Sequence, residues 1–213
     1  MVKMVVFDLD GTLMNSLTDL AISVNYGLKL NGLEEKPVEN YKTYVGNGRE
    51  MLIRRAMGDA WTDHELFEKV KADYDRHYAV HCNDHTAAYD GCAEMLEKLA
   101  EKGVKTGVLS NKPDEFVDKM LKKAFPNHKF TQAWGQKPQY KTKPEPDALL
   151  ALLNMSGVTP EECFYVGDSD IDVFTANNAG VKMAGVSWGF RGKNELMNAG
   201  AQFVADTTRS EER

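Results

Sequence analysis

Two aspartates separated by a single residue, Asp8 and Asp10, follow a short apolar run at the start of the chain. Paired carboxylates in one loop suit a two-step reaction, because one can attack phosphorus and the other can move protons. Gly11 and Thr12 come next. The glycine allows a sharp turn that directs backbone N–H groups and the threonine hydroxyl toward a phosphate. This spacing therefore indicates chemistry on a phosphoryl group, through an aspartyl-phosphate.

Further polar side chains follow apolar runs later in the chain. Ser110 and Asn111 follow VKTGVL, and Lys143 lies in the loop KTKPEP. The acidic residues after CFYVG are Asp168, Asp170 and Asp172. Because reactive groups collect at the carboxyl ends of parallel strands, we expect these side chains to converge on the two early aspartates.

Several carboxylates at one edge raise each other's pKa values unless a cation lies among them. A few hard oxygen ligands that leave room for water and phosphate suit Mg²⁺ better than zinc or a full calcium cage. Ser110 and Lys143 would hold the transferring phosphoryl oxygens, where charge must be neutralised. Asp170 is expected to cap the following helix rather than to bind metal.

The segment HCNDH, which holds His81, Cys82 and His85, lacks a fourth zinc ligand, so we expect a surface or hinge role.

The elements that would position these groups alternate between strand and helix from residue 90 onward, as in a parallel α/β sheet. Strands are predicted over 2–7, 104–111, 128–135, 163–168, 181–188 and 201–206, and helices over 92–103, 113–125, 144–157 and 171–180. Residues 15–85 instead show helical periodicity throughout. A parallel sheet must be covered on both faces, so the helical block is an insertion. The sequence predicts a Rossmann-like α/β core domain over 1–14 and 86–213, with a helical domain over 15–85.

The composition excludes several classes of protein. The 213 residues are 42% apolar and 27% charged, as in an ordinary globular protein, and their formal charge of −6 disfavours binding to nucleic acid or anionic membranes. We expect no signal peptide, because no basic region followed by a long apolar core is found at the start of the sequence, and no apolar run reaches membrane-spanning length. A cytoplasmic location is therefore expected. The 3 cysteines form no CxxC pair, which suits reduced thiols.

The motifs together resemble those of the haloacid dehalogenase superfamily of phosphatases. They are DLDGTL at 8–13, LSN at 109–111, the lysine of KTKPEP and GDSDID at 167–172. The resemblance covers nearly the whole chain. The stretches VGNGREMLIRRAM, LSNKP and VSWGFRGKNEL are similar to the phosphoglycolate phosphatase-like branch, whose members carry a helical cap after the first motif.

The resemblance implies a role for each acidic residue. Asp8 would be the nucleophile and Asp10 the general acid/base, with Mg²⁺ bound by Asp8, the Asp10 backbone carbonyl and Asp168. Dehalogenases of the superfamily lack a second aspartate in this motif, so the presence of Asp10 disfavours C–Cl hydrolysis. Asp172 would either support the metal site or orient Lys143, and Lys143 with Ser110 would contact the phosphoryl group.

Substrate choice is expected to depend on the helical cap. The loop VGNGRE holds Gly48, which permits close approach, and Arg49, whose planar fork suits a carboxylate or a second phosphate. With Ser110, Asn111 and Lys143, these two residues form the predicted substrate-binding set. The expected partner is a small anionic phosphorylated metabolite such as phosphoglycolate, and the protein is expected to be a monomer or homodimer.

Other activities fit parts of the same pattern. A phosphomutase similar to β-phosphoglucomutase would have a histidine in the hinge after the first motif, but the first histidine here is His64. A sugar-phosphate or pyrophosphate phosphatase of the same family would carry the same motifs. A non-catalytic binding protein would be expected to lack the nucleophile or the lysine, and both are present.

Overall fold

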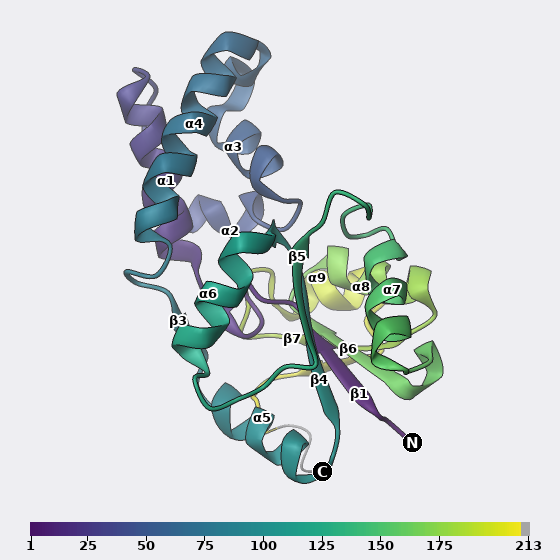
Figure 1. The fold of residues 1–213 in the computed structure, drawn as a ribbon. Coiled ribbons are helices and arrows are strands. Elements are labelled where there is room, and N and C mark those ends of the chain that lie inside the picture. The colour runs from purple at the N-terminus through teal and green to yellow at the C-terminus, as the bar shows by residue number, and fades with distance from the viewer. Residues whose placement is uncertain (210–213) are drawn as a thin grey trace.

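The computed structural model describes residues 1–209, and its centre is a six-stranded parallel sheet with the order β5-β4-β1-β6-β7-β8 (Figure 1). The strands are β1 (Met4–Phe7), β4 (Lys105–Pro113), β5 (Gln132–Gln136), β6 (Cys163–Gly167), β7 (Lys182–Val186) and β8 (Phe203–Ala205). In the middle of the sheet, Val6 of β1 pairs with Gly107 on one side and Tyr165 on the other. The predicted α/β fold with a parallel sheet is confirmed. The last four residues of the predicted core segment 86–213 lie outside the described residues.

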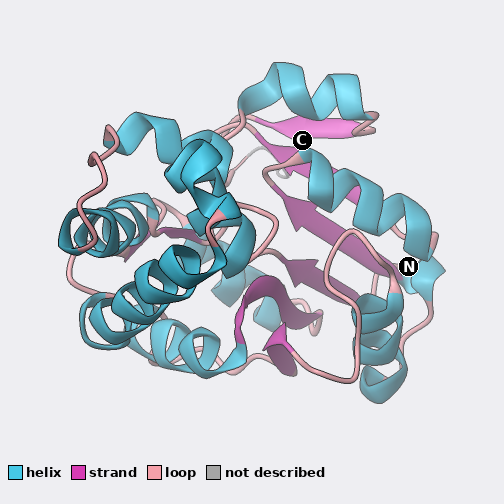
Figure 2. Ribbon diagram, turned by 90° about the horizontal axis from the view of Figure 1, so that it is seen from above, coloured by secondary structure: helices cyan, strands magenta, loops and turns pink. Residues whose placement is uncertain are grey.

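Helices cover both faces of this sheet (Figures 1 and 2). They are α5 (Cys92–Glu101) and α6 (Asp114–Ala124) on one face, and α7 (Asp147–Ser156), α8 (Asp170–Ala179) and α9 (Gly192–Ala199) on the other. Successive side chains of a strand point to opposite faces. Accordingly, Val5 and Phe7 pack in the hydrophobic cluster of α5 and α6, while Met4 and Val6 pack in that of α7 and α8. This two-sided burial explains why β1 is apolar at every position.

Between β1 and α5 the chain forms a helical block that stands above one end of the sheet (Figure 1). Its helices are α1 (Leu17–Leu30), α2 (Tyr41–Tyr44), α3 (Arg49–Met57) and α4 (His64–His81), with 3₁₀ turns at Val38–Asn40 and Gly58–Thr62. Gly27 allows α1 to approach α4 closely, because a Cβ atom there would lie 2.8 Å from the Val70 carbonyl oxygen. In the described part of the chain, no helix has both the length and the apolar character needed to cross a membrane.

A two-stranded antiparallel ribbon joins the helical block to the sheet. It pairs β2 (Met14–Asn15) with β3 (Ala87–Ala88). This ribbon was not predicted, since strands of two residues show no periodicity. Both passages of the chain between block and sheet cross this ribbon. We propose that it is the hinge between the two predicted domains, over 15–85 and over 1–14 with 86–213.

The structure differs locally from the predictions. The strand expected over 128–135 begins only at Gln132, after the turn that follows Pro126. Helix α9 was not predicted, because its sequence GKNELMNA is mostly polar and only Leu196 is fully buried. The N-cap of α8 is Ser169 rather than Asp170. Asp172 completes this cap by accepting hydrogen bonds from the backbone N–H and the hydroxyl of Ser169.

Candidate active site

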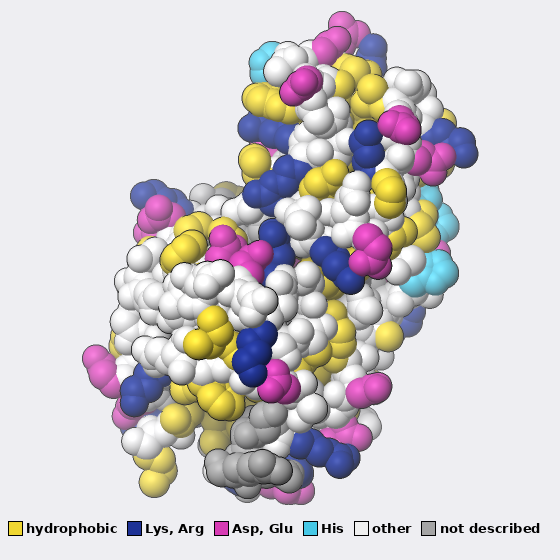
Figure 3. All heavy atoms as spheres, turned by 180° about the vertical axis from the view of Figure 1, so that it is seen from behind, with side chains coloured by type: hydrophobic (Ala, Val, Ile, Leu, Met, Phe, Trp, Pro, Cys, Tyr) yellow, Lys and Arg dark blue, Asp and Glu magenta, His cyan; other side chains and the backbone are white. Residues whose placement is uncertain are grey.

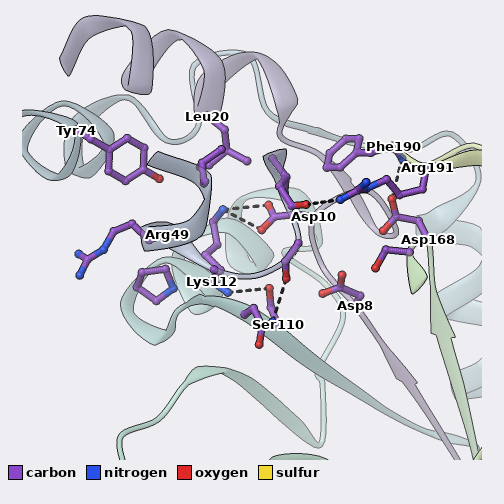
Figure 4. Close-up of a pocket in the computed structure, with 17 residues that line it drawn as sticks. Asp8, Asp10, Leu20, Arg49, Tyr74, Ser110, Lys112, Asp168, Phe190 and Arg191 are labelled. Atoms are coloured by element: carbon purple, nitrogen blue, oxygen red, sulfur yellow. Dashed lines mark hydrogen bonds and ion pairs between the residues drawn. The ribbon is translucent and has the colours of Figure 1, made fainter. Parts of the chain in front are cut away.

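A pocket lies where the carboxyl ends of β1, β4 and β6 meet the helical block (Figure 4). The predicted site residues that line it are Asp8, Asp10, Ser110, Asn111 and Asp168 from the sheet edge, with Gly48 and Arg49 from the helical block. Lys143 and Asp172 lie directly behind Asp8 and contact each other. The structure therefore brings together the four motifs that hold these residues, as we predicted from their positions in the sequence.

Lys143 joins two buried carboxylates. Its Nζ lies 2.9 Å from Asp8 Oδ1 and 2.7 Å from Asp172 Oδ1, and it donates to the Tyr165 hydroxyl at 3.1 Å. Burial alone would lower the pKa of Lys143, but the carboxylates of Asp172 and Asp8 hold it well above its ordinary value. Lys143 therefore remains charged. Asp172 has the contact expected of a residue that orients this lysine.

Asp168 is enclosed by backbone. Its Oδ2 accepts a hydrogen bond of 2.7 Å from the Phe190 N–H, and a Cβ atom on Gly11 would lie only 2.3 Å from that oxygen. Gly189 is equally constrained, because its Cβ atom would lie 2.2 Å from the Asp168 Cβ. The glycine of the first motif, at a φ of +87°, thus serves the close approach of a carboxylate as well as the turn of its loop.

The buried acidic residues form a group that could hold a metal ion. Asp8, Asp168 and Asp172 each offer an oxygen, and these oxygens all lie within 4.8 Å of one another. Burial, followed by repulsion from neighbouring carboxylates, raises the pKa of Asp168 well above its ordinary value. A divalent cation would remove this penalty, and hard oxygen donors suit it. The chemistry of the site therefore fits a hard metal ion.

Asp8 leads to a prediction about stability without metal. Burial raises its pKa from the ordinary 3.8 to about 7, against the opposing effect of Lys143. The folded protein therefore keeps a proton that the unfolded chain releases above about pH 4, so folding loses stability as pH rises toward 7. We expect the melting temperature of EDTA-treated Asp8→Asn, relative to wild type, to increase between pH 5 and 8. A melting-temperature difference that stays constant or shrinks over this pH range would contradict the raised pKa of Asp8.

The Asp10 carboxylate lies outside that acidic group and has a different cation. Both of its oxygens accept hydrogen bonds from Lys112 Nζ at 3.0 Å (Figure 4). Oδ1 also accepts a hydrogen bond from the Ser16 hydroxyl. Sequence reasoning did not identify Lys112, although LSNKP places it two residues after Ser110. On an extended strand, residues two apart share a face, and this signal could have placed Lys112 at the site.

Two of the predicted substrate-binding side chains, those of Arg49 and Asn111, have partners within the protein. The guanidinium of Arg49 contacts both carboxylate oxygens of Asp75, at 2.8 and 2.9 Å, and points away from Asp8 (Figure 4). The Asn111 side chain donates to the Gly46 and Lys143 carbonyls and accepts from the Lys143 N–H. Asn111 therefore ties the loop that carries Lys143 to the helical block.

Gly48 has a backbone conformation that favours glycine. Its φ is +83°, and a Cβ atom there would lie 3.3 Å from the Asn111 carbonyl oxygen on β4. A side chain at this position would therefore be strained whatever the space around it.

The segment HCNDH has structural contacts. His81 Nδ1 lies 2.7 Å from Asp84 Oδ2, Cys82 is buried, and the backbone N–H of His85 donates to Asp19. Among residues 1–209, the one candidate group of three or more metal ligands contains none of these residues. These contacts fit the expected surface or hinge position.

Comparison with known proteins gives consistent matches along the chain. Residues 5–186 match the family model of haloacid dehalogenase-like hydrolases. A phosphoglycolate phosphatase of Mannheimia succiniciproducens is 36% identical over 195 residues, covering 88% of this chain and 87% of that protein. One from Pseudomonas fluorescens is 33% identical over 213 residues, covering 97% and 77%.

Solved structures also match the architecture of this chain. A crystal structure from Lactobacillus delbrueckii subsp. bulgaricus has a TM-score of 0.93 and 31% identity, with 99% of this chain and 96% of that chain covered. The structure of a predicted phosphoglycolate phosphatase from Haemophilus somnus has a TM-score of 0.91 and 29% identity, with the same coverage of both chains.

Proposed function

Because the chain belongs to the haloacid dehalogenase-like hydrolase family, we propose that it is a Mg²⁺-dependent phosphatase that hydrolyses phosphoglycolate. The observation that carries this proposal is the buried Asp8, whose carboxylate contacts Lys143 at the floor of a pocket that Asp10 and Ser110 also line. The names of the relatives support the choice of substrate.

The proposed reaction has two steps. An oxygen of Asp8 attacks phosphorus, so that a bond to Asp8 forms as the ester P–O bond breaks. Asp10 gives a proton to the leaving oxygen and then accepts one from the water that attacks the aspartyl-phosphate. This second step releases phosphate and restores Asp8. The Ser110 hydroxyl and the Lys143 ammonium bind the phosphoryl oxygens, where charge increases.

The metal would complete the neutralisation of charge in this site. Asp8, Asp168 and the Asp10 backbone carbonyl would hold Mg²⁺, with Asp172 keeping Lys143 in place beside them. When bound, the ion neutralises the phosphoryl oxygens and the crowded carboxylates. In this assignment the Asp10 side chain is not a metal ligand, so its carboxylate is kept for proton transfer.

The expected partner is a small anionic metabolite. On the face in Figure 3, Lys and Arg side chains are interspersed with Asp and Glu, so that face offers no continuous basic surface for nucleic acid. Within the described residues, Cys82, Cys92 and Cys163 form no disulfide, which agrees with our proposal of a cytoplasmic enzyme. We propose that it acts as a monomer or homodimer.

Metal removal tests this function directly. We expect phosphate release from phosphoglycolate with Mg²⁺, and a loss of at least about 100-fold with EDTA that Mg²⁺ reverses, because the clustered carboxylates need a cation. The panel should include sugar phosphates, pyrophosphate and β-glucose 1-phosphate, the last also assayed for glucose 6-phosphate. A preference for a sugar phosphate or pyrophosphate, or formation of glucose 6-phosphate, would replace phosphoglycolate with one of the other family activities.

A further inference from the structure

Lys112 has a position in the pocket that the proposed mechanism does not use. It lies on β4, two residues after Ser110, and its backbone N–H donates to the Ser110 hydroxyl at 3.2 Å. Its side chain is only 3% exposed, and Nζ lies over the ring of Tyr78 at 4.9 Å from the centroid. Lys112 therefore holds a buried positive charge beside the phosphoryl-binding hydroxyl, between the sheet edge and α4.

The charge of Lys112 contacts Asp10, the residue that must reach the leaving oxygen. Nζ donates to both Asp10 oxygens at 3.0 Å, and Ser16 donates to one of them. Hydrogen bonds between charged groups in a buried site hold a carboxylate firmly. In this arrangement, the Asp10 carboxylate stays paired with Lys112 until another anion replaces it at the Lys112 ammonium.

The other cations around the pocket have partners elsewhere. Arg49 pairs with both oxygens of Asp75, and Arg191 Nη2 donates to the carbonyls of Thr43 and Val45. Lys143 forms ion pairs with Asp8 and Asp172 beneath the proposed phosphoryl position. Among the described residues that line the pocket, Lys112 is the cation that contacts the proton-transferring residue.

We propose that Lys112 binds the carboxylate of the substrate, and that this carboxylate displaces Asp10 from Lys112 and frees it to approach the leaving oxygen. The inference rests on the proposed function and identifies the residue that selects its substrate. In phosphoglycolate a single carbon separates the carboxylate from the ester oxygen. A substrate so short needs its cation beside the phosphoryl site, where Lys112 lies, rather than at Arg49, whose charge points away from Asp8 (Figure 4).

The expected signature is discrimination between two esters with similar leaving groups. Ethyl phosphate resembles phosphoglycolate but lacks the carboxylate. A charged hydrogen bond gained on binding, together with the release of Asp10, should favour phosphoglycolate by about 100-fold in kcat/KM. Part of this preference should be in kcat, because Asp10 is released only when the carboxylate is present.

The experiment compares this preference among wild type, Lys112→Met, Lys112→Arg and Arg49→Met. We expect it to fall below about 10-fold in Lys112→Met and to be largely retained in Lys112→Arg and Arg49→Met. Loss of Asp10 positioning alone would slow both esters equally and leave their ratio unchanged. Lys137→Met is the matched control, because Lys137 also pairs with an aspartate, Asp114, and lies over a ring, that of Trp134, away from the pocket.

Each other outcome has a defined meaning. A wild-type preference that persists in Lys112→Met, that disappears in Arg49→Met instead, or that is absent from wild type would overturn the inference. Failure of the proposed function is distinguishable, because wild type would then release no p-nitrophenolate from p-nitrophenyl phosphate with Mg²⁺. Should Lys112→Met not fold, as judged by its melting curve, Lys112→Gln provides the neutral variant.

Discussion

Asp8→Asn is expected to lower phosphate release by at least about 1,000-fold, equivalent to about 4 kcal/mol of transition-state stabilisation. The amide has the shape of the carboxylate but is a poor nucleophile, so the aspartyl-phosphate cannot form. The measurement is kcat for phosphoglycolate with saturating Mg²⁺. The fold should persist, because burial already disfavours the charged form of Asp8, whose pKa it raises to about 7.

The control for this variant is Asp170→Asn. Asp170 lies in the motif GDSDID, but its Oδ1 accepts a hydrogen bond from the Ile171 N–H and it does not line the pocket. We expect Asp170→Asn to stay within about 3-fold of wild type, as for a surface change away from the reacting atoms. Near-normal turnover in Asp8→Asn would show that Asp8 is not the nucleophile.

Lys143→Met is expected to abolish turnover and also to destabilise the protein. Removal of the ammonium leaves Asp8 and Asp172 buried without their shared cation, a change that typically costs about 3–5 kcal/mol. For a protein of this size, each kcal/mol lowers the melting temperature by about 2–4 °C. Thermal melts in EDTA measure the stability, and phosphate release measures the phosphoryl-binding role.

A double variant separates these two effects. Lys143→Met with Asp172→Asn removes one of the unpaired charges, so we expect part of the stability to return while turnover remains absent. Recovery of activity together with stability would mean that Lys143 acts only as a structural ion pair. An unchanged melting temperature in Lys143→Met alone would contradict the buried contacts of Lys143 with Asp8 and Asp172.

The sequence predicted the sheet and most of the site because both depend on local patterns. Apolar runs that end in polar residues mark parallel strands, and parallel strands place Asp8, Ser110 and Asp168 at one edge regardless of distance along the chain. Helix α9 escaped prediction because its sequence is polar and only Leu196 is fully buried.

Side-chain pairing could not be predicted in the same way. The partner of Arg49 is Asp75, 26 residues away on another helix, and the partner of Lys112 is Asp10, 102 residues away. Such ion pairs depend on how the helical block packs against the sheet, which no periodicity specifies. The predictions placed Arg49 in the pocket wall but not the direction of its charge.

The most direct test of the central claim is to identify the residue that carries the phosphoryl group during turnover. Enzyme mixed with phosphoglycolate and Mg²⁺ would be quenched in acid, digested, and mapped by mass spectrometry. We expect a phosphate on the peptide that contains Asp8, absent in Asp8→Asn and labile in mild base. Steady phosphate release with no phosphorylated peptide, or with phosphate on another residue, would contradict it.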